Sequence, residues 1–144
     1  VEDWMTPDPI TISSTATLGD AYDCMLENDV RRLPVVDEAD ELIGIVTRSD
    51  VLQAVPPLQG VNDDGEIAAV PLSEMPIRDI MAWEPVTVAP SDTIRRAAQR
   101  MIEYQISGLP VVEGDQLVGI ITESDIFRVV IEFLDDRRGK AKAR

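Results

Sequence analysis

Two short segments of the chain carry the residues best suited to bind a ligand. Each has a glycine, two β-branched residues and a threonine, followed three positions later by an aspartate: Gly44–Thr47 with Asp50, and Gly119–Thr122 with Asp125. A threonine hydroxyl can bond a phosphate, and a carboxylate can accept both hydroxyls of a ribose. If a helix begins here, its free amides and positive dipole end also favour an anion. The residue types of each segment are therefore suited to bind a phosphate and a ribose.

A purely structural interpretation of the same residues stays open. Thr-x-x-Asp at a strand-to-helix turn is also a capping box, in which the hydroxyl accepts from the aspartate amide and the carboxylate accepts from the threonine amide. The preceding glycine can simply let two backbones pack closely.

Catalysis is not expected from this composition. The sequence has no histidine, which removes the commonest general base and metal ligand. Its single cysteine, Cys24, can form neither an internal disulfide nor a multi-cysteine metal site, and we expect it to pack in a helix. No nucleophile–base pair, Gly-Lys-Ser/Thr loop or Gly-x-Gly-x-x-Gly run is present, so a small hydrolase or transferase is the weakest functional alternative.

Charge limits the partners. The chain carries a net charge of −14, although its last ten residues hold five basic against two acidic side chains. A body this acidic repels phosphate backbones, so we expect no nucleic-acid binding by the fold. We expect the basic C-terminus to be solvated and frayed. No apolar stretch approaches about 18 residues and no basic-then-apolar leader opens the chain, so we expect a cytoplasmic protein without membrane contact.

The chain is an internal repeat. Residues 1–37 placed over 77–113 give twelve identities, including Leu33–Val36 over Leu109–Val112. After one residue drops out of a turn, seven of fourteen positions match from Leu42 over Leu117, including both Thr and Asp residues of the two segments. A period of this length indicates a repeated structural unit.

Each copy predicts the order β-α-β-β-α, with a further helical turn before it at Asp3–Met5 and Ile77–Met81. The β-branched runs Ile10–Ile12 and Val86–Val88 suit strands. Thr17 and Thr93 are the expected N-caps of the first helices. Those helices have apolar stripes at i, i+3, i+4, i+7 and i+8, formed by Leu18, Ala21, Tyr22, Met25 and Leu26, and by Ile94, Ala97, Ala98, Met101 and Ile102. Two strands follow, at 33–37 and 42–47 and at 109–112 and 117–122, and then a second helix from Ser49 and from Ser124 to Leu134.

A proline-rich segment, Pro56–Pro76, joins the copies and is expected to be a linker. It contains Asp63-Asp64 in a turn-forming run. Isolated acidic pairs in turns are usually solvated, so we predict no metal site there.

The paired segments, each preceded by Leu-Pro-Val-Val, resemble a cystathionine-β-synthase-type (CBS) domain pair, or Bateman module. The resemblance implies an α/β (α+β) fold in which tandem β-α-β-β-α repeats form a pseudo-two-fold sandwich with two clefts. It places the first repeat at residues 1–55, the linker at 56–76, the second repeat at 77–134 and a basic tail at 135–144.

The resemblance also implies adenosine-bearing ligands in the clefts. By position, Asp50 and Asp125 would hold ribose, and Thr47 and Thr122 would face phosphate. Residues flanking the base would be Thr11 and Thr87, with apolar walls from Leu33, Pro34, Leu109 and Pro110.

The two copies differ in charge near the expected phosphate. The first has Arg31, Arg32 and Arg48, whereas the second has Ser107, Gly108 and Glu123. Local positive charge favours a phosphate in an acidic body, so we predict the first copy to be the better phosphate site. A solvated face, with the arginines paired to nearby carboxylates, is the alternative.

We therefore predict a regulatory module that senses adenosine nucleotides, with AMP favoured, and that needs no cofactor. The alternatives are a sensor of S-adenosylmethionine or NAD, or a ligand-free module for dimerisation. A homodimer is expected through the second helices, where Ile126, Phe127, Val130, Ile131, Phe133 and Leu134 are more apolar than one buried face requires. An effector protein or domain would read the occupancy.

Overall fold

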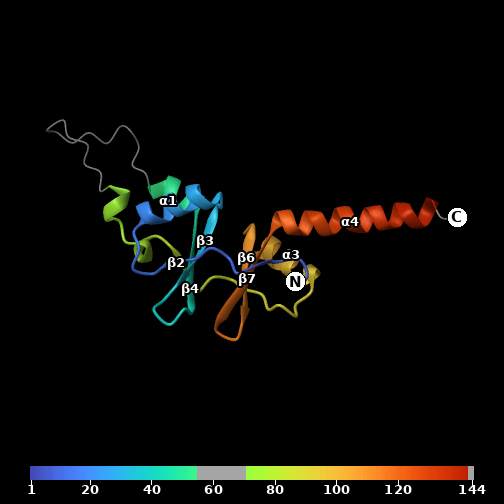
Figure 1. Ribbon diagram of the computed structural model, residues 1–144, viewed down its shortest axis with the longest axis horizontal. Coiled ribbons are helices and arrows are strands. Elements are labelled where there is room, and N and C mark those ends of the chain that lie inside the picture. The colour runs from blue at the N-terminus through green and yellow to red at the C-terminus, as the bar shows by residue number, and fades with distance from the viewer. Residues whose placement is uncertain (55–70, 143–144) are drawn as a thin grey trace. The chain divides into compact units, whose positions relative to one another are not determined.

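A computed structural model describes residues 1–54 and 71–142, with side chains up to residue 139. It is a mixed α+β structure with two sheets and four α-helices among these residues (Figure 1). The elements follow in the order β1 (Thr6–Pro7), β2 (Ile12–Ser13), α1 (Leu18–Asn28), β3 (Arg32–Val36), β4 (Leu42–Thr47), α2 (Arg48–Ala54), two 3₁₀ turns (Leu72–Glu74 and Ile77–Asp79), β5 (Ala82–Trp83), α3 (Ile94–Tyr104), β6 (Gly108–Glu113), β7 (Gln116–Thr122) and α4 (Glu123–Lys142).

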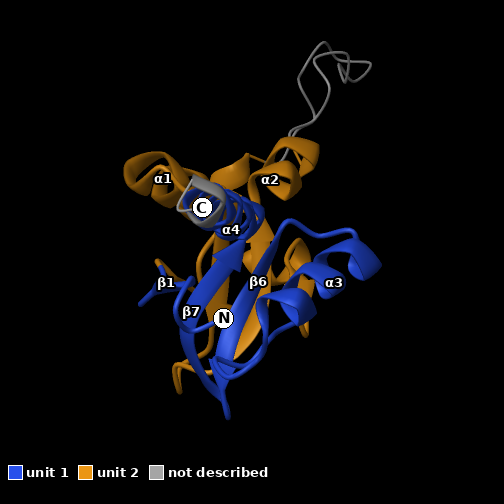
Figure 2. Ribbon diagram, turned by 90° about the vertical axis from the view of Figure 1, so that its right-hand side faces the viewer, with its two compact units in different colours: residues 1–9, 86–144 blue, residues 10–85 orange. Residues whose placement is uncertain are grey.

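The chain divides into two compact units, coloured separately in Figure 2. Unit 2 contains residues 10–85 and a four-stranded sheet in the order β2-β3-β4-β5. Unit 1 contains residues 1–9 and the chain from residue 86 onward, with a three-stranded sheet in the order β1-β7-β6. Each unit therefore contains most of one sequence copy together with the first nine residues of the other copy, 1–9 or 77–85. We call these nine residues the leading segment of a copy.

This exchange of leading segments has the same register in both units. In unit 2, β5 pairs antiparallel with β4 at Ile45↔Ala82. In unit 1, β1 pairs antiparallel with β7 at Ile120↔Thr6. The predicted strands Ile10–Ile12 and Val86–Val88 are reduced to β2 and to a single parallel bridge at Val88↔Val111, at repeat-equivalent positions.

Each first helix buries its apolar stripe in its own unit. Thr17 and Thr93 cap α1 and α3 as expected, by accepting from Asp20 and Arg96 amides. The cores contain the buried stripe residues together with strand residues and, in unit 2, Ile77 and Met81 from the leading segment. The last stripe position is the exception, since Leu26 is 61% exposed and Ile102 is 80% exposed.

The C-terminal helix is longer than predicted. We expected the second helix of copy two to end at Leu134 and the tail to fray, and both expectations are wrong because α4 continues to Lys142. Residues 135–138 contain no glycine or proline that would end the helix. The Arg137 guanidinium lies 5.4 Å from the centre of the Phe133 ring one turn earlier. The second helices also begin one residue earlier than predicted, at Arg48 and Glu123.

The predicted linker lies mostly outside the described residues, and so does Asp63-Asp64. Its described end belongs to the packing of unit 2. The Leu18 amide donates to the Met75 carbonyl at 2.8 Å, and the Ile77 amide donates to the Ala16 carbonyl at 3.0 Å. These bonds fasten the segment before β5 to the start of α1.

The glycine of each segment is required by this exchange. A Cβ on Gly44 would lie 2.6 Å from the Met81 sulfur and 3.0 Å from the Ala82 carbonyl oxygen. A Cβ on Gly119 would lie 2.5 Å from the Met5 sulfur and 3.0 Å from the Thr6 carbonyl oxygen. Met5 and Met81 occupy equivalent repeat positions, so one steric constraint operates twice.

We predict that Gly119→Ala lowers the free energy of unfolding by about 1–3 kcal/mol, because an added methyl has no room beside the leading strand. Urea denaturation followed by circular dichroism measures it. Gly139→Ala is the control: nothing lies within 4 Å of its Cβ position in α4, and it should stabilise by about 0.5–1 kcal/mol. Equal midpoints for the two variants would contradict the steric argument.

Candidate functional site

The predicted Thr–Asp segments form the turns between β4 and α2 and between β7 and α4. In the first copy the Thr47 amide donates to Asp50 Oδ2 at 2.8 Å, and the Asp50 amide donates to Thr47 Oγ1 at 3.3 Å. This is the capping box that the structural interpretation expects. It uses only one oxygen of the carboxylate.

The second copy uses the same residue types differently. Asp125 Oδ2 accepts from both the Thr122 amide at 2.9 Å and the Thr122 hydroxyl at 3.3 Å. Asp125 is buried, with 4% of its surface exposed, whereas Asp50 is half-buried. The Thr122 hydroxyl therefore donates its proton to the Asp125 carboxylate. The Thr47 hydroxyl instead accepts from the Asp50 amide, so its proton can be donated to another group.

The first copy has a second difference at the other carboxylate oxygen. Asp50 Oδ1 has no hydrogen-bond partner within the described part of unit 2. Asp125 Oδ1 accepts from Arg128 Nη1 at 3.1 Å, and the side chains are 6% and 68% exposed, respectively. Arg128 was not among the expected site residues, although its i, i+3 spacing from Asp125 is the helical spacing for such a pair.

The alternation of side chains along a strand places the other predicted site residues on two opposite faces of each sheet. In β3, Leu33 belongs to the core of unit 2, so its neighbours Arg32 and Pro34 face the opposite side of the sheet. Arg32 lies opposite Thr47 and Pro34 opposite Ile45 in the β3–β4 pairing. Arg32, Pro34 and Thr47 therefore share one sheet face, which Leu33 does not.

The second copy repeats this arrangement. Gly108 lies opposite Thr122 and Pro110 opposite Ile120, while Leu109 belongs to the core of unit 1. Both prolines are fully buried. In each copy, the predicted apolar wall thus contains one residue of the unit's core and one buried proline on the opposite face of the sheet.

The remaining predicted residues lie around the turns. The Arg48 amide donates to the Arg31 carbonyl at 2.7 Å, which brings two exposed arginines together beside Thr47. The Glu123 amide makes the equivalent bond to the Ser107 carbonyl at 3.0 Å. Thr11 precedes β2 and is exposed, and Thr87 precedes the Val88 bridge and is half-buried.

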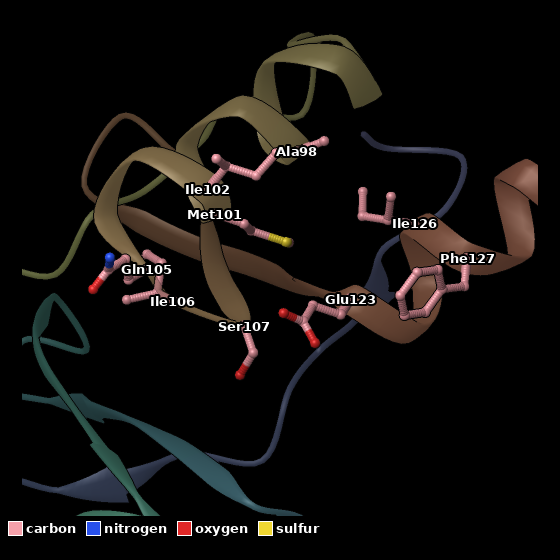
Figure 3. A pocket seen from close by; sticks show the side chains of 9 residues that line it. All are labelled: Ala98, Met101, Ile102, Gln105, Ile106, Ser107, Glu123, Ile126 and Phe127. Carbon is pink, nitrogen blue, oxygen red and sulfur yellow. The ribbon is translucent and has the colours of Figure 1, made fainter.

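An apolar groove of about 570 Å³ lies beside α3 and the start of α4 within unit 1 (Figure 3). Ser107 and Glu123 are its polar residues near the turn, and Gln105 lies at the end of α3. Its other lining residues are apolar: Ala98, Met101, Ile102, Ile106, Ile126 and Phe127.

The described residues contain no group of three or more His, Cys, Asp or Glu side chains that could hold a metal ion. None of the helices in residues 1–54 and 71–142 combines the length and apolar character needed to cross a membrane.

A family model for the CBS domain matches residues 1–57 and 77–132, and so includes most of each repeat copy. The chain belongs to the CBS-domain family. The match confirms the resemblance expected from the repeated Thr–Asp segments, and the mixed α+β fold is that of CBS pairs.

Solved structures of CBS proteins resemble this CBS pair over nearly its whole length. A putative acetoin utilization protein from Vibrio cholerae is 36% identical, with a TM-score of 0.74 over 96% of this chain and 95% of that one. CBSX2, solved in complex with AMP, is 27% identical, with a TM-score of 0.74 over 92% and 96% of the two chains. The CBS domain pair of protein MJ0100, solved with 5′-methylthioadenosine and S-adenosyl-L-methionine, is 28% identical, with a TM-score of 0.73 over 90% and 94%.

Several curated relatives are much longer proteins than this chain. The CBS pair spans 31% and 24% of the first two, and the second is a homoserine O-acetyltransferase of Methanohalobium evestigatum, 30% identical over 134 residues. The match to an enzyme's name therefore covers only a quarter of that enzyme.

We predict that Asp125→Ala lowers the free energy of unfolding by about 2 kcal/mol and Asp50→Ala by about 1 kcal/mol. The first removes three hydrogen bonds at a buried carboxylate, and the second removes one at a half-buried carboxylate that water reaches more easily. Urea denaturation of both variants measures the difference. A loss for Asp50→Ala equal to or above that for Asp125→Ala would contradict this account.

Proposed function

We propose that this CBS pair is a regulatory module that binds adenosine nucleotides at its Thr–Asp turns, with AMP as the ligand. The observation that carries the proposal is the state of Asp50. Its carboxylate caps α2 through Oδ2 and keeps Oδ1 without a partner in unit 2, so it can cap the helix and accept ribose hydroxyls at the same time.

The neighbouring groups suit a phosphate. The Thr47 hydroxyl keeps a proton to donate, and Arg32 lies opposite Thr47 on the same sheet face. Arg31 and Arg48 are exposed beside the turn. In a chain of net charge −14, these cations favour a phosphorylated ligand at the first copy.

The solved relatives support an adenosine-containing ligand, but they were solved with different ligands of this class. CBSX2 was solved with AMP, and the MJ0100 pair was solved with methylthioadenosine and S-adenosylmethionine. The first-copy arginines favour the phosphate of AMP over a sulfonium ligand. S-adenosylmethionine and NAD stay the alternative ligands, and a ligand-free module for dimerisation is the alternative function.

A thermal-shift panel of AMP, ADP, ATP, S-adenosylmethionine and NAD separates these functions, since a ligand that binds only the folded state raises the midpoint. AMP should raise it most. A panel without any shift would favour the ligand-free module.

We predict that Asp50→Ala weakens AMP binding more than Asp125→Ala does. Loss of two charge-assisted bonds to ribose should cost about 1.5–3 kcal/mol at the occupied site. The first copy gains phosphate contacts from its arginines, whereas Glu123 opposes phosphate at the second. Isothermal titration calorimetry on both variants measures the losses.

Asp20→Ala is the matched control for this comparison. Asp20 forms the same Thr-x-x-Asp capping box with Thr17 at the start of α1, and it belongs to neither Thr–Asp turn. Its removal should lower stability without changing AMP affinity. Equal losses for Asp50→Ala and Asp125→Ala, or a larger loss for Asp125→Ala, would overturn the asymmetry.

We propose further that the module is a homodimer through α4. Phe127, Val130, Ile131 and Leu134 are spaced i, i+3, i+4 and i+7, and each is between 48% and 62% exposed. This stripe begins at the groove, to which Ile126 and Phe127 also belong. A continuous apolar strip of this kind needs a partner in water, and a second copy supplies a matching strip.

For the dimer, we predict that sedimentation velocity at micromolar concentration gives twice the chain mass of 15.9 kDa, and that Ile131→Glu gives the monomer. A charge placed within the apolar strip has no partner there and is costly to bury. Leu26→Glu is the control, since Leu26 is 61% exposed on α1. A wild-type protein that sediments only as 15.9 kDa would contradict the proposal.

The output of the module belongs to another domain or protein in this proposal. The CBS pair spans about a quarter of the homoserine O-acetyltransferase that it matches, so we propose that the ligand signal is read by such an attached or separate effector. A catalytic role, nucleic-acid binding and membrane contact are not part of the proposal, and a cytoplasmic location stays a prediction.

A further inference from the structure

The two turns differ in how many acceptor positions their carboxylates still offer. A carboxylate has about four lone-pair positions. Asp50 uses one of them, for the Thr47 amide. Asp125 uses three, for the Thr122 amide, the Thr122 hydroxyl and Arg128 Nη1. Counting only the described residues of each unit, about three positions are open at Asp50 and about one at Asp125.

A ribose presents two vicinal hydroxyls, and a carboxylate that holds both must accept two protons. Asp50 can do so as it stands. Asp125 can do so only after Arg128 leaves Oδ1, because the two Thr122 donors are tied to the turn itself. The Arg128 side chain is 68% exposed and can turn into water at small cost.

The first copy has no equivalent of this arginine. The repeat alignment places Gln53 over Arg128, and Gln53 is exposed and neutral. The difference between the copies at this position is therefore independent of the arginines near the phosphate. It acts on the ribose alone.

We infer that Arg128 is a specificity-determining residue that competes with the ribose diol for Asp125. It makes the second turn weaker for ligands with a free 2′,3′-diol, while the first turn is open to them. This inference rests on the proposed function, because it assigns a regulator to one of its two sites. Ligands that need only one acceptor are not subject to the competition.

The test uses adenosine, which has the diol and no phosphate, together with 2′-deoxyadenosine, which lacks one hydroxyl. Asp50→Asn isolates the second turn, since the asparagine oxygen can still cap the Thr47 amide. In that background, Arg128→Gln should raise adenosine affinity about fivefold, the upper range for an exposed ion pair. The affinity for 2′-deoxyadenosine should not change. Ligand-observed NMR titration measures both.

The reciprocal exchange supplies the matched variant. Asp125→Asn isolates the first turn, and Gln53→Arg should lower adenosine affinity there by about fivefold without affecting 2′-deoxyadenosine. Arg128→Gln and Gln53→Arg each introduce the residue that the other copy already has at the equivalent position, so each residue suits its helix.

The outcomes separate this inference from the proposed function. If wild-type protein binds neither AMP nor adenosine, the proposed function fails and the inference fails with it. If wild-type protein binds and Arg128→Gln leaves adenosine affinity unchanged or lowers it, only the inference is overturned. An equal gain for adenosine and 2′-deoxyadenosine would also overturn it, because competition for the diol predicts a difference.

Discussion

Both units depend on the addition of a short strand from the other sequence copy. β5 pairs with β4 and β1 pairs with β7, so neither sheet is completed by its own copy. The methionine before each leading strand lies against the glycine of the opposite hairpin. A side chain on that glycine would push the strand away and expose the edge of β4 or β7. The glycine therefore serves the exchange, and the threonine three residues later benefits because the strand that carries it is held on both sides.

Capping and ligand binding are compatible in the Thr–Asp turn, although they first look like competing explanations. A carboxylate has two oxygens, and the helix cap uses Oδ2 in both copies. What remains for a ligand is decided by Oδ1 and by the direction of the threonine hydroxyl. In the described part of unit 2, Asp50 Oδ1 has no hydrogen-bond partner and the Thr47 hydroxyl keeps its proton, whereas in the second copy the Thr122 hydroxyl and Arg128 both donate to the carboxylate. The same four-residue motif thus caps a helix in both copies, and in the first copy it also leaves groups that suit the proposed ligand.

Local features of the fold could be predicted from the sequence because they arise from neighbouring residues. The repeat and its spacing located the helices, their Thr17 and Thr93 caps and the hairpins. The exchange of leading segments could not be predicted in this way, since Asp3–Met5 and Ile77–Met81 look alike and either could serve either sheet. The exposure of Leu26 and Ile102 was missed because a stripe of five positions is wider than the contact of these helices with their sheets. The Thr and Asp residues of the site were located by motif, but their hydrogen bonds depend on side-chain conformations that spacing does not determine. Arg128 is the clearest case, since an i, i+3 pair forms only when both side chains turn toward each other.

The position of Arg128 also connects the second turn to the proposed dimer surface. It lies on α4 directly after Phe127 and two residues before Val130, so the residue that competes for Asp125 is flanked by the apolar strip. α2, which follows the first turn, is described only to Ala54, whereas α4 runs 20 residues from Glu123 to Lys142. Under the inference above, a ligand that displaces Arg128 leaves this exposed cation beside the strip without its carboxylate partner. A charge change there acts on association directly, because burying an apolar strip is hindered by an unpaired cation at its edge. If both proposals hold, ligand occupancy at the second turn and association through α4 are linked by the Arg128 side chain.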